Sequence, residues 1–262
     1  GEIVNGDLAW GPEIRFKAPP APGMISKLPA WPLLAKFIRV AMRFLPQRLM
    51  RPFLLGFVTT FLAPSHLLFQ KGAILVNTRG KRFCDERNRP QDHIGRQENK
   101  CAWIIFGAEV AGQFRAYPNF ISTAPGVGYA NLTDYENTRP DVVFKATSLA
   151  ELAQKINADA AALAESIDVF NASLAEDDER AAITTAPYYA LGPAISWIVF
   201  SEGGLKVDEK LRVLGHSGLP VPGLYAAGSA GQGGLLLEGH GHHLSWAFTS
   251  GRLAGTHAAA DR

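Results

Sequence analysis

The sequence predicts an α/β fold, in which short apolar strands are combined with amphipathic helices. Three observations predict this class. Short apolar runs at residues 72–76 and 101–107 are typical of buried strands, residues 148–175 have the apolar spacing of helices, and residues 223–259 have the order strand, glycine turn and helix. With 262 residues, of which 47% are hydrophobic, the chain can bury one large core or two smaller ones.

The composition excludes several classes of protein. An apolar fraction of 47% excludes an intrinsically disordered chain, and a net charge of +2 gives no reason to expect nucleic-acid binding. The two cysteines, Cys84 and Cys101, are too few for a disulfide framework and lie in no CxxC motif. We therefore expect a reduced, cytoplasmic protein.

The charge is concentrated at one end of the chain. Between Ile14 and Cys84 there are twelve Lys or Arg residues and no Asp or Glu, whereas the remaining sequence has 14 basic and 24 acidic residues. The first residues, Gly1–Val4, have no initiator Met and no signal-peptide pattern, so this start is typical of processing, truncation or a split gene.

The basic window contains two predicted helical segments. Residues 18–32 are a Pro-rich loop, residues 33–45 have the pattern of a basic amphipathic helix, and residues 52–69 are apolar but interrupted by a glycine and a proline. The uninterrupted stretches are too short to span a membrane. A buried helical hairpin with basic side chains reaching solvent is one interpretation, and contact of residues 31–69 with a membrane surface or an apolar substrate is the other.

The elements after this window follow from local signals. The strand at 72–76 is followed by a turn at 77–80, and a second strand is predicted at 101–107. In the helical stretch, Ser148 and Glu151 form a capping box, and Asn157 divides two helices.

The C-terminal part is predicted to contain strands and one long helix. Residues 203–214 have the pattern of a hairpin, residues 223–228 that of a buried strand ending in a glycine turn, and residues 242–259 that of a helix.

The glycine-rich turn at residues 228–241 is the strongest candidate for a ligand site. Glycines permit close approach of the backbone, and a helix N-terminus offers free N–H groups and a positive dipole end. The histidines His240, His242 and His243 suit acid–base catalysis or carbonyl polarisation, or else they pack and cap the helix. No HExxH or CxxC ligand set accompanies them, so we expect no metal.

Two further sets of residues are candidates. Tyr188, in the segment Ala186–Gly192, lines a pocket or is a half-buried strand residue. The charged residues between Asp85 and Arg96 form a site or a solvated loop.

Four segments, in this order, carry a resemblance. They are Gly72–Glu86 (GAILVNTRGKRFCDE), Ser148–Asn171, Ala186–Leu191 with Gly203–Asp208, and Val221–Gly255 (VPGLYAAG…GRLAG). Their combination resembles the FAD-dependent fumarate reductase/succinate dehydrogenase-type flavoproteins from about residue 70 to the C-terminus. The basic window before residue 70 matches less well.

The resemblance implies the C-terminal part of an FAD-binding Rossmann-like domain together with an α+β capping domain. A GxGxxG fingerprint, which belongs to the N-terminal half of that domain, does not occur in the chain. We expect a helical junction at 1–70, a capping domain at 71–185 and the C-terminal part of the FAD domain at 186–262. We also expect a partner polypeptide that carries the missing half.

By this resemblance, six residues of the glycine turn approach the flavin: Gly228, Ser229, Gly239, Gly241, His243 and Leu244. Ser229 stands where the family usually has an acidic residue. The helix N-terminus beyond the turn would stabilise negative charge on the reduced ring.

The branch of the family can be narrowed. Phe200 and Glu238 stand where fumarate reductases have a His and an Arg that hold a dicarboxylate, and a glutamate cannot pair with a carboxylate. The spacing from Gly239 through Gly241 to Leu244 resembles the 3-ketosteroid dehydrogenase branch, which desaturates a ketone and transfers hydride to flavin N5. Two tyrosines of that branch are replaced, by Leu237 and at about Gln91.

The expected function is therefore FAD-dependent desaturation of a CH–CH bond beside the carbonyl of a small apolar ketone, such as a cyclic ketone or a steroid. The N–H of Gly241 would polarise the carbonyl, and His240, His242 or Tyr188 would replace the missing tyrosines. The alternative is a non-catalytic binding or scaffold subunit of a flavoprotein complex.

Overall fold

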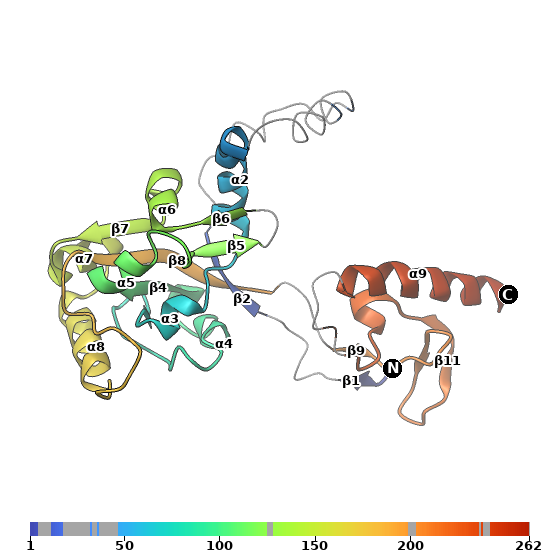
Figure 1. The fold of residues 1–262 in the computed structure, drawn as a ribbon. Coiled ribbons are helices and arrows are strands. Elements are labelled where there is room, and N and C mark those ends of the chain that lie inside the picture. The colour runs from blue at the N-terminus through green and yellow to red at the C-terminus, as the bar shows by residue number, and fades with distance from the viewer. Residues whose placement is uncertain are drawn as a thin grey trace. The chain divides into compact units, whose positions relative to one another are not determined.

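The computed structural model describes residues 1–4, 12–17, 32, 36, 47–124, 128–198, 203–235, 237 and 242–261. The chain forms two units, shown in Figure 1. Unit 1 comprises Gly1–Glu13 and Trp197–Arg262, and unit 2 comprises Ile14–Ser196. The predicted loop at 18–32 and the predicted helix at 33–45 lie outside the described residues, apart from two single positions.

Unit 2 is built on a five-stranded sheet with β8 at its centre. The strands have the order β2-β8-β4-β3, with β7 also paired to β8. The β3–β4, β4–β8 and β7–β8 pairs are antiparallel. The strands are β2 (Pro12–Phe16), β3 (Ile74–Val76), β4 (Cys101–Phe106), β7 (Val143–Ala146) and β8 (Tyr188–Ile198). The strands predicted at 72–76 and 101–107 are thus confirmed.

Both faces of this sheet are covered by helices. Side chains alternate between the faces of a strand, so Ile74 and Val76 contribute to one core and Leu75 to the other. One core contains side chains of α7 (Leu149–Ile156) and α8 (Ala160–Ala172). The other core contains side chains of the helices that precede β7 in the sequence. Burial on both faces explains why these strands are continuously apolar.

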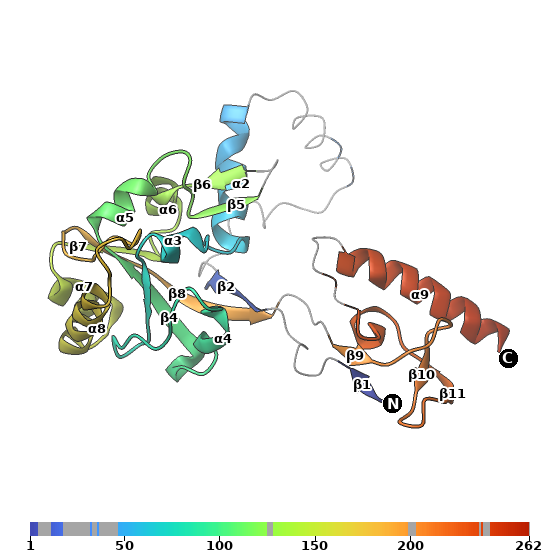
Figure 2. The same cartoon turned by 60° about the horizontal axis from the view of Figure 1, so that its bottom comes forward.

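Unit 2 also contains elements that are not part of this sheet. They are α2 (Gln47–Phe61), α3 (Leu67–Gln70), α4 (Gln91–Ile94), η3 (Glu98–Lys100), α5 (Ala108–Gln113), β5 (Ser122–Ala124), β6 (Gly128–Ala130) and α6 (Leu132–Thr138). Figure 2 shows α2 beside the β5–β6 hairpin, and α2 lies against β6. No described helix is long and apolar enough to cross a membrane.

The helix pair at 148–175 forms as its sequence predicts. Asn157 ends α7 in a left-handed conformation (φ 55°), which divides it from α8. The Ser148 side chain accepts a hydrogen bond from the Glu151 N–H (3.2 Å), which is half of the predicted capping box. In the other half of a capping box the Glu151 carboxylate would accept from the Ser148 N–H. Here it accepts instead from the N–H and the hydroxyl of Thr147, which offer two donors.

The segment Gly72–Glu86 is a hairpin held by one buried carboxylate. Glu86 is 2% exposed and accepts hydrogen bonds from the Leu75 N–H (2.9 Å) and from the Arg82 guanidinium (2.7 Å to Nη2). Its turn contacts α8, where the Ser166 hydroxyl donates to the Gly80 carbonyl (2.9 Å) and accepts from the Arg82 N–H (3.0 Å). The positions of Gly80, Arg82 and Glu86 in this segment are therefore explained by the contacts that hold the hairpin together.

Unit 1 contains two small antiparallel sheets, β1–β9 and β10–β11, and a long helix. The predicted 203–214 hairpin is confirmed by the antiparallel bridge between Val207 and Val213. The elements are β1 (Ile3–Val4), β9 (Gly204–Leu205), β10 (Arg212–Leu214), β11 (Pro220–Tyr225), η4 (Gly228–Gly231) and α9 (His242–Ala260). The long C-terminal helix is thus confirmed.

Two features differ from the expected organisation. The strand predicted to be buried at 223–228 forms as β11, but Leu224 is 43% exposed, because β10 is the one described strand that pairs with it. In addition, β8 begins at Tyr188, on the C-terminal side of the boundary that we expect at 185/186, and pairs with β4 and β7, which lie on the other side of it. The expected boundaries at 70/71 and 185/186 stay predictions.

Candidate functional site

The glycine turn of unit 1 is fixed to the helix that follows it. Gly228 has a left-handed backbone (φ +60°), and its N–H donates to the Ser250 hydroxyl at 2.8 Å. The Trp246 indole N–H donates to the Gly228 carbonyl at 3.1 Å. The Ser250 hydroxyl itself donates to the Trp246 carbonyl at 2.5 Å. Two side chains of α9 therefore hold both backbone polar groups of the first residue of η4.

The backbone around this turn is packed without room for side chains. A Cβ at Gly231 would overlap the Ala226 carbonyl oxygen, and a Cβ at Gly204 would lie 2.7 Å from the Ser229 carbonyl oxygen. Gly228 differs, since a Cβ there would meet no other atom closer than 3.9 Å. The turn is thus closed at Gly231 and Gly204 and open at Gly228, where the Cα has space for the close approach of a ligand.

The electrostatics of the turn favour a ligand edge that carries negative charge or carbonyl oxygens. Residues 226–235 contain no charged side chain, and the first turn of α9 contains two histidines and no acidic residue. The N-terminus of a helix of 19 residues adds the positive end of a dipole.

The predicted flavin-contacting residues divide between two described elements and an undescribed segment. Gly228 and Ser229 lie in η4, and His242, His243 and Leu244 form the first turn of α9. Ser229, His242 and Leu244 are exposed, and Gly228 and His243 are half-buried. Gly239, His240 and Gly241 lie outside the described residues, and so do Phe200 and Glu238. The roles of all these residues stay predictions.

The two adjacent tyrosines of β8 have different surroundings. Tyr188 is half-buried, and its hydroxyl donates to the Thr184 carbonyl at 3.0 Å. Tyr189 points to the opposite face, is 1% exposed, and stacks on Phe106 with ring centroids 5.4 Å apart. Its hydroxyl accepts a hydrogen bond from Arg115 at 2.8 Å.

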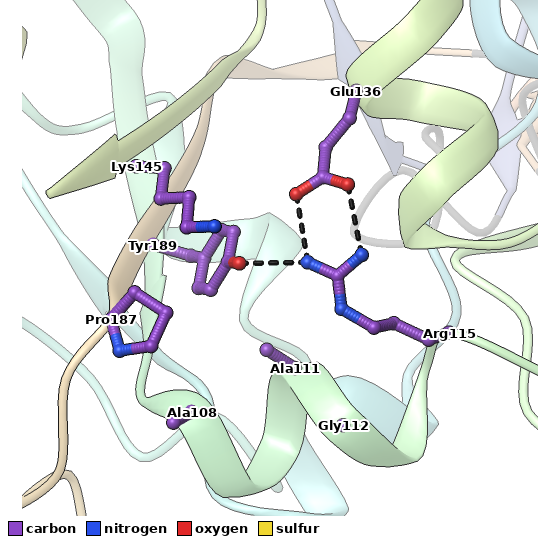
Figure 3. Close-up of a pocket in the computed structure, with 8 residues that line it drawn as sticks. All are labelled: Ala108, Ala111, Gly112, Arg115, Glu136, Lys145, Pro187 and Tyr189. Carbon is purple, nitrogen blue, oxygen red and sulfur yellow. Dashed lines mark hydrogen bonds and ion pairs between the residues drawn. The ribbon is translucent and has the colours of Figure 1, made fainter.

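Tyr189, not Tyr188, lines a pocket of about 460 Å³ in unit 2 (Figure 3). Arg115 binds both carboxylate oxygens of Glu136 at 2.9 Å. The hydrogen bonds to Glu136, and to a smaller extent the one to Tyr189, raise the pKa of the Arg115 guanidinium. The Lys145 ammonium lies 5.7 Å from the centroid of the Tyr189 ring. The wall is completed by Ala108, Ala111, Gly112 and Pro187.

The sequence analysis did not identify this pocket. Glu136 lies on α6, Lys145 on β7 and Arg115 two residues after the end of α5, and no spacing links them in the sequence. The period of two in a strand does indicate that Tyr189 and Tyr188 face opposite sides. With two cations and one carboxylate, the pocket suits a small polar or anionic molecule.

Apart from the buried Glu86, the charged residues described between Asp85 and Arg96 lie at the surface. Arg87 pairs with Asp85 at 2.8 Å and Arg89 with Asp92 at 2.6 Å, and the two arginine side chains are 59% and 60% exposed. These contacts favour the structural interpretation of the segment. Among the residues that the structure describes, no group of three or more His, Cys, Asp or Glu could hold a metal ion.

Comparison with known proteins finds one family. A family model described as "FAD binding domain" matches residues 42–236 of the chain. The hairpin of unit 2 lies within this match, and the glycine turn at 228–241 lies within it as far as residue 236.

Individual relatives are longer than this chain. A fumarate reductase (cytochrome) from Shewanella frigidimarina is 31% identical over 201 residues, which is 72% of this chain and 32% of that protein. A 4-oxocyclohex-2-ene-1-carboxylate 5-dehydrogenase from Sinomonas cyclohexanicum is 26% identical over 72% of this chain and 36% of its own length. The chain thus spans about a third of the length of these relatives.

A solved structure shares the fold over the whole chain. The 3-ketosteroid Δ1-dehydrogenase from Sterolibacterium denitrificans matches with a TM-score of 0.56 at 20% identity, over 100% of this chain and 45% of that one. At this identity the likeness concerns the fold alone.

Proposed function

The chain belongs to the FAD binding domain family, the FAD-dependent flavoproteins of fumarate reductase type, and on this premise we propose that it is part of an oxidoreductase that desaturates a ketone. Its cofactor is FAD. The proposed reaction removes hydrogen from the CH–CH bond α,β to the carbonyl. The observation that carries the proposal is the glycine turn at Gly228, which the side chains of Trp246 and Ser250 fix to α9.

The glycine turn fits one edge of FAD. Its open side at Gly228 admits a ring edge, its residues 226–235 carry no charge, and the N-terminus of α9 favours negative charge. We infer that Gly228, Ser229, His243 and Leu244, with Gly239 and Gly241, contact the flavin. Bound FAD would supply hydride acceptance at N5. The protein's own contribution is to orient the ring edge and to stabilise the charge that it gains.

The substrate carbonyl is assigned to the same end of α9. In this proposal the Gly241 N–H donates to the carbonyl oxygen, and His240 or His242 adds a second donor. Polarising the carbonyl acidifies the α proton, which a base must remove. Tyr188 donates its hydroxyl to Thr184 within the described structure, which favours a positioning role for this tyrosine.

An uncharged ketone is the substrate class that the sequence supports. Glu238 would repel a substrate carboxylate at the position where fumarate reductases use an arginine. A relative with 26% identity is named for the dehydrogenation of 4-oxocyclohex-2-ene-1-carboxylate, a cyclic ketone that also carries a carboxylate, so it supports the cyclic ketone and not the absence of charge. We propose a cyclic or steroid-like ketone on these grounds.

The rest of the FAD site is proposed to come from polypeptide outside this sequence. A GxGxxG fingerprint, which binds the dinucleotide part of FAD, does not occur in the sequence. A native mass spectrum of the protein from its own host tests this point. A complex that contains further polypeptide and the mass of FAD supports the proposal, and a bare chain without flavin favours the non-catalytic binding subunit.

The catalytic proposal is tested by substitution at the two ends of α9. His242→Ala, in the first turn, is expected to lower kcat for dye-coupled oxidation of a cyclic ketone by about tenfold to a hundredfold, because a donor to the carbonyl is lost. His257→Ala, in the last turn of the same helix, is the control and should retain wild-type kcat. Equal kcat in both variants would remove His242 from the reaction, and flavin binding without turnover on any ketone would refute the substrate class.

A further inference from the structure

The pocket that Tyr189 lines has the size of a binding site for a small organic molecule (Figure 3). Its volume is about 460 Å³, and small-molecule sites in proteins usually enclose about 300–1,000 Å³. All of its lining residues belong to unit 2, where they lie on or next to α5, α6, β7 and β8. The class of its ligand can therefore be inferred from this unit alone.

Arg115 is held by partners within the protein. Its Nη1 donates to Glu136 at 2.9 Å and to the Thr133 hydroxyl at 3.1 Å. Its Nη2 donates to the second carboxylate oxygen of Glu136 at 2.9 Å and to the Tyr189 hydroxyl at 2.8 Å. A guanidinium has five N–H donors, and these bonds use four of them. Arg115 therefore fixes the wall of the pocket and leaves the recognition of a ligand to other groups.

The Tyr189 hydroxyl has a proton that it can donate to a ligand. Because the hydroxyl oxygen accepts from Arg115, its own O–H points away from the guanidinium. The Tyr189 side chain is 1% exposed, and no acceptor for its O–H lies among the residues that the structure describes. A hydroxyl that accepts from a cation is a stronger donor, since hydrogen bonds in a chain polarise one another. An oxygen atom of a ligand in the pocket is the acceptor that suits it.

The Lys145 ammonium is the second donor that is open to a ligand. Figure 3 shows it beside the ring of Tyr189, and it lies 5.7 Å from the ring centroid. No carboxylate in the described part of the chain pairs with this ammonium, and Glu136 is already paired with Arg115. Two cations and one carboxylate give the lining of the pocket a net charge of +1. A ligand with a single negative charge would neutralise it.

We propose that this pocket binds a small organic carboxylate, whose two oxygens accept hydrogen bonds from Lys145 and from the Tyr189 hydroxyl. The rest of the wall is apolar and carries small side chains, so it has space for the apolar body of such a molecule. It consists of Ala108, Ala111, Gly112 and Pro187. A phosphate ion would leave this part of the wall unused. The proposal rests on residues of unit 2 and does not depend on the reaction proposed above.

Isothermal titration calorimetry of the full chain tests the ligand class with three probes: benzoate, benzamide and inorganic phosphate. Benzoate and benzamide have the same shape, but only benzoate is charged at neutral pH, and phosphate is charged but has no apolar body. Benzoate is expected to bind at least about tenfold more tightly than either of the others. Equal binding of benzamide would refute recognition of the charge, and equal binding of phosphate would refute the apolar contact. Absence of benzoate binding would overturn the proposal.

Variants of the two donors test the place of binding. Lys145→Met is expected to weaken benzoate binding by about tenfold or more, because the unpaired positive charge is lost. Tyr189→Phe keeps the ring that stacks on Phe106 and is expected to weaken binding several-fold. Lys100→Met is the matched control, since this lysine of unit 2 is exposed and does not line the pocket, and it should bind benzoate like the wild type. Far-UV circular dichroism checks that all three variants fold. Wild-type affinity in folded Lys145→Met and Tyr189→Phe would show that benzoate binds elsewhere and refute the site.

Discussion

Single buried charges organise the larger unit, and Glu86 is the clearest case. Its carboxylate is 2% exposed and joins the Leu75 N–H of β3 to the Arg82 guanidinium, which is itself partly buried. A buried charge persists only if it is paired and hydrogen-bonded, and both conditions are met here. The nearby Arg79–Glu98 pair has a similar length, 2.6 Å, but its side chains are 69% and 49% exposed.

This contrast predicts that two glutamate substitutions lower the free energy of unfolding by different amounts. Glu86→Ala should lower the free energy of unfolding by about 3–5 kcal/mol, because it leaves a partly buried guanidinium without its partner. Glu98→Ala, which removes an exposed ion pair, should cost at most about 1 kcal/mol. Urea unfolding of both variants measures the difference. Similar losses in the two variants would show that burial of Glu86 contributes little.

At the scale of elements, the pairing of η4 with α9 is the feature that prepares a ligand site. The Ser250 hydroxyl accepts from the Gly228 N–H and donates to the Trp246 carbonyl, and Ser250 is fully buried. Thr256 in the same helix makes the same type of bond to the carbonyl four residues earlier, at 2.9 Å, but it is exposed. Of these two hydroxyls, the buried one of Ser250 bonds to the turn, together with the Trp246 indole.

Two hydroxyl deletions in α9 therefore separate the turn contact from the helix contact. Ser250→Ala should lower the free energy of unfolding by about 1–3 kcal/mol, since the Gly228 N–H loses its acceptor. It should also weaken FAD binding to the flavoprotein several-fold. Thr256→Ala should change stability by no more than about 0.5 kcal/mol and leave FAD binding unchanged. Flavin fluorescence titration and urea unfolding measure both effects, and normal FAD affinity in Ser250→Ala would argue against the assigned site.

At the scale of the whole molecule, basic residues are concentrated in one part of the chain, and one side chain connects that part to the rest of unit 2. The basic window of the sequence supplies β2 and α2, which are joined to the acidic remainder of unit 2 by Arg139. This side chain is 3% exposed and donates to the Lys17 carbonyl at 2.6 Å, to the Thr59 carbonyl at 2.8 Å and to Asp141 at 2.9 Å. One guanidinium thus ties three distant segments together.

Loss of this connection should loosen the basic segments selectively. Arg139→Met should lower the free energy of unfolding by about 2–4 kcal/mol, because two carbonyl groups and a carboxylate lose their donor. Hydrogen exchange should become faster in β2 and α2 and remain slow in α7 and α8. Arg87→Met is the control, because Arg87 forms the same kind of pair with an aspartate two residues away but is 59% exposed. Uniformly faster exchange throughout unit 2 would contradict a local tie.

The elements that the sequence predicted correctly are those with local signals. The strands β3 and β4, the helices α7 and α8 and the long helix α9 are specified by apolar spacing, by the cap at Ser148 and by the break at Asn157. Each of these signals lies within a few residues of the element that it specifies. The family motifs followed from the same segments, and they identified FAD as the cofactor.

The sequence by itself determined the class of fold, the flavoprotein family and the glycine turn that precedes α9. The tertiary structure decided which tyrosine lines a pocket, how far β11 is exposed and which rings of α2 remain in water. These features depend on partners far away in the chain. Arg115 reaches Tyr189 across 74 positions, and Arg139 reaches Lys17 across 122. Local spacing cannot encode such contacts, because they exist only after the sheet has brought its strands together.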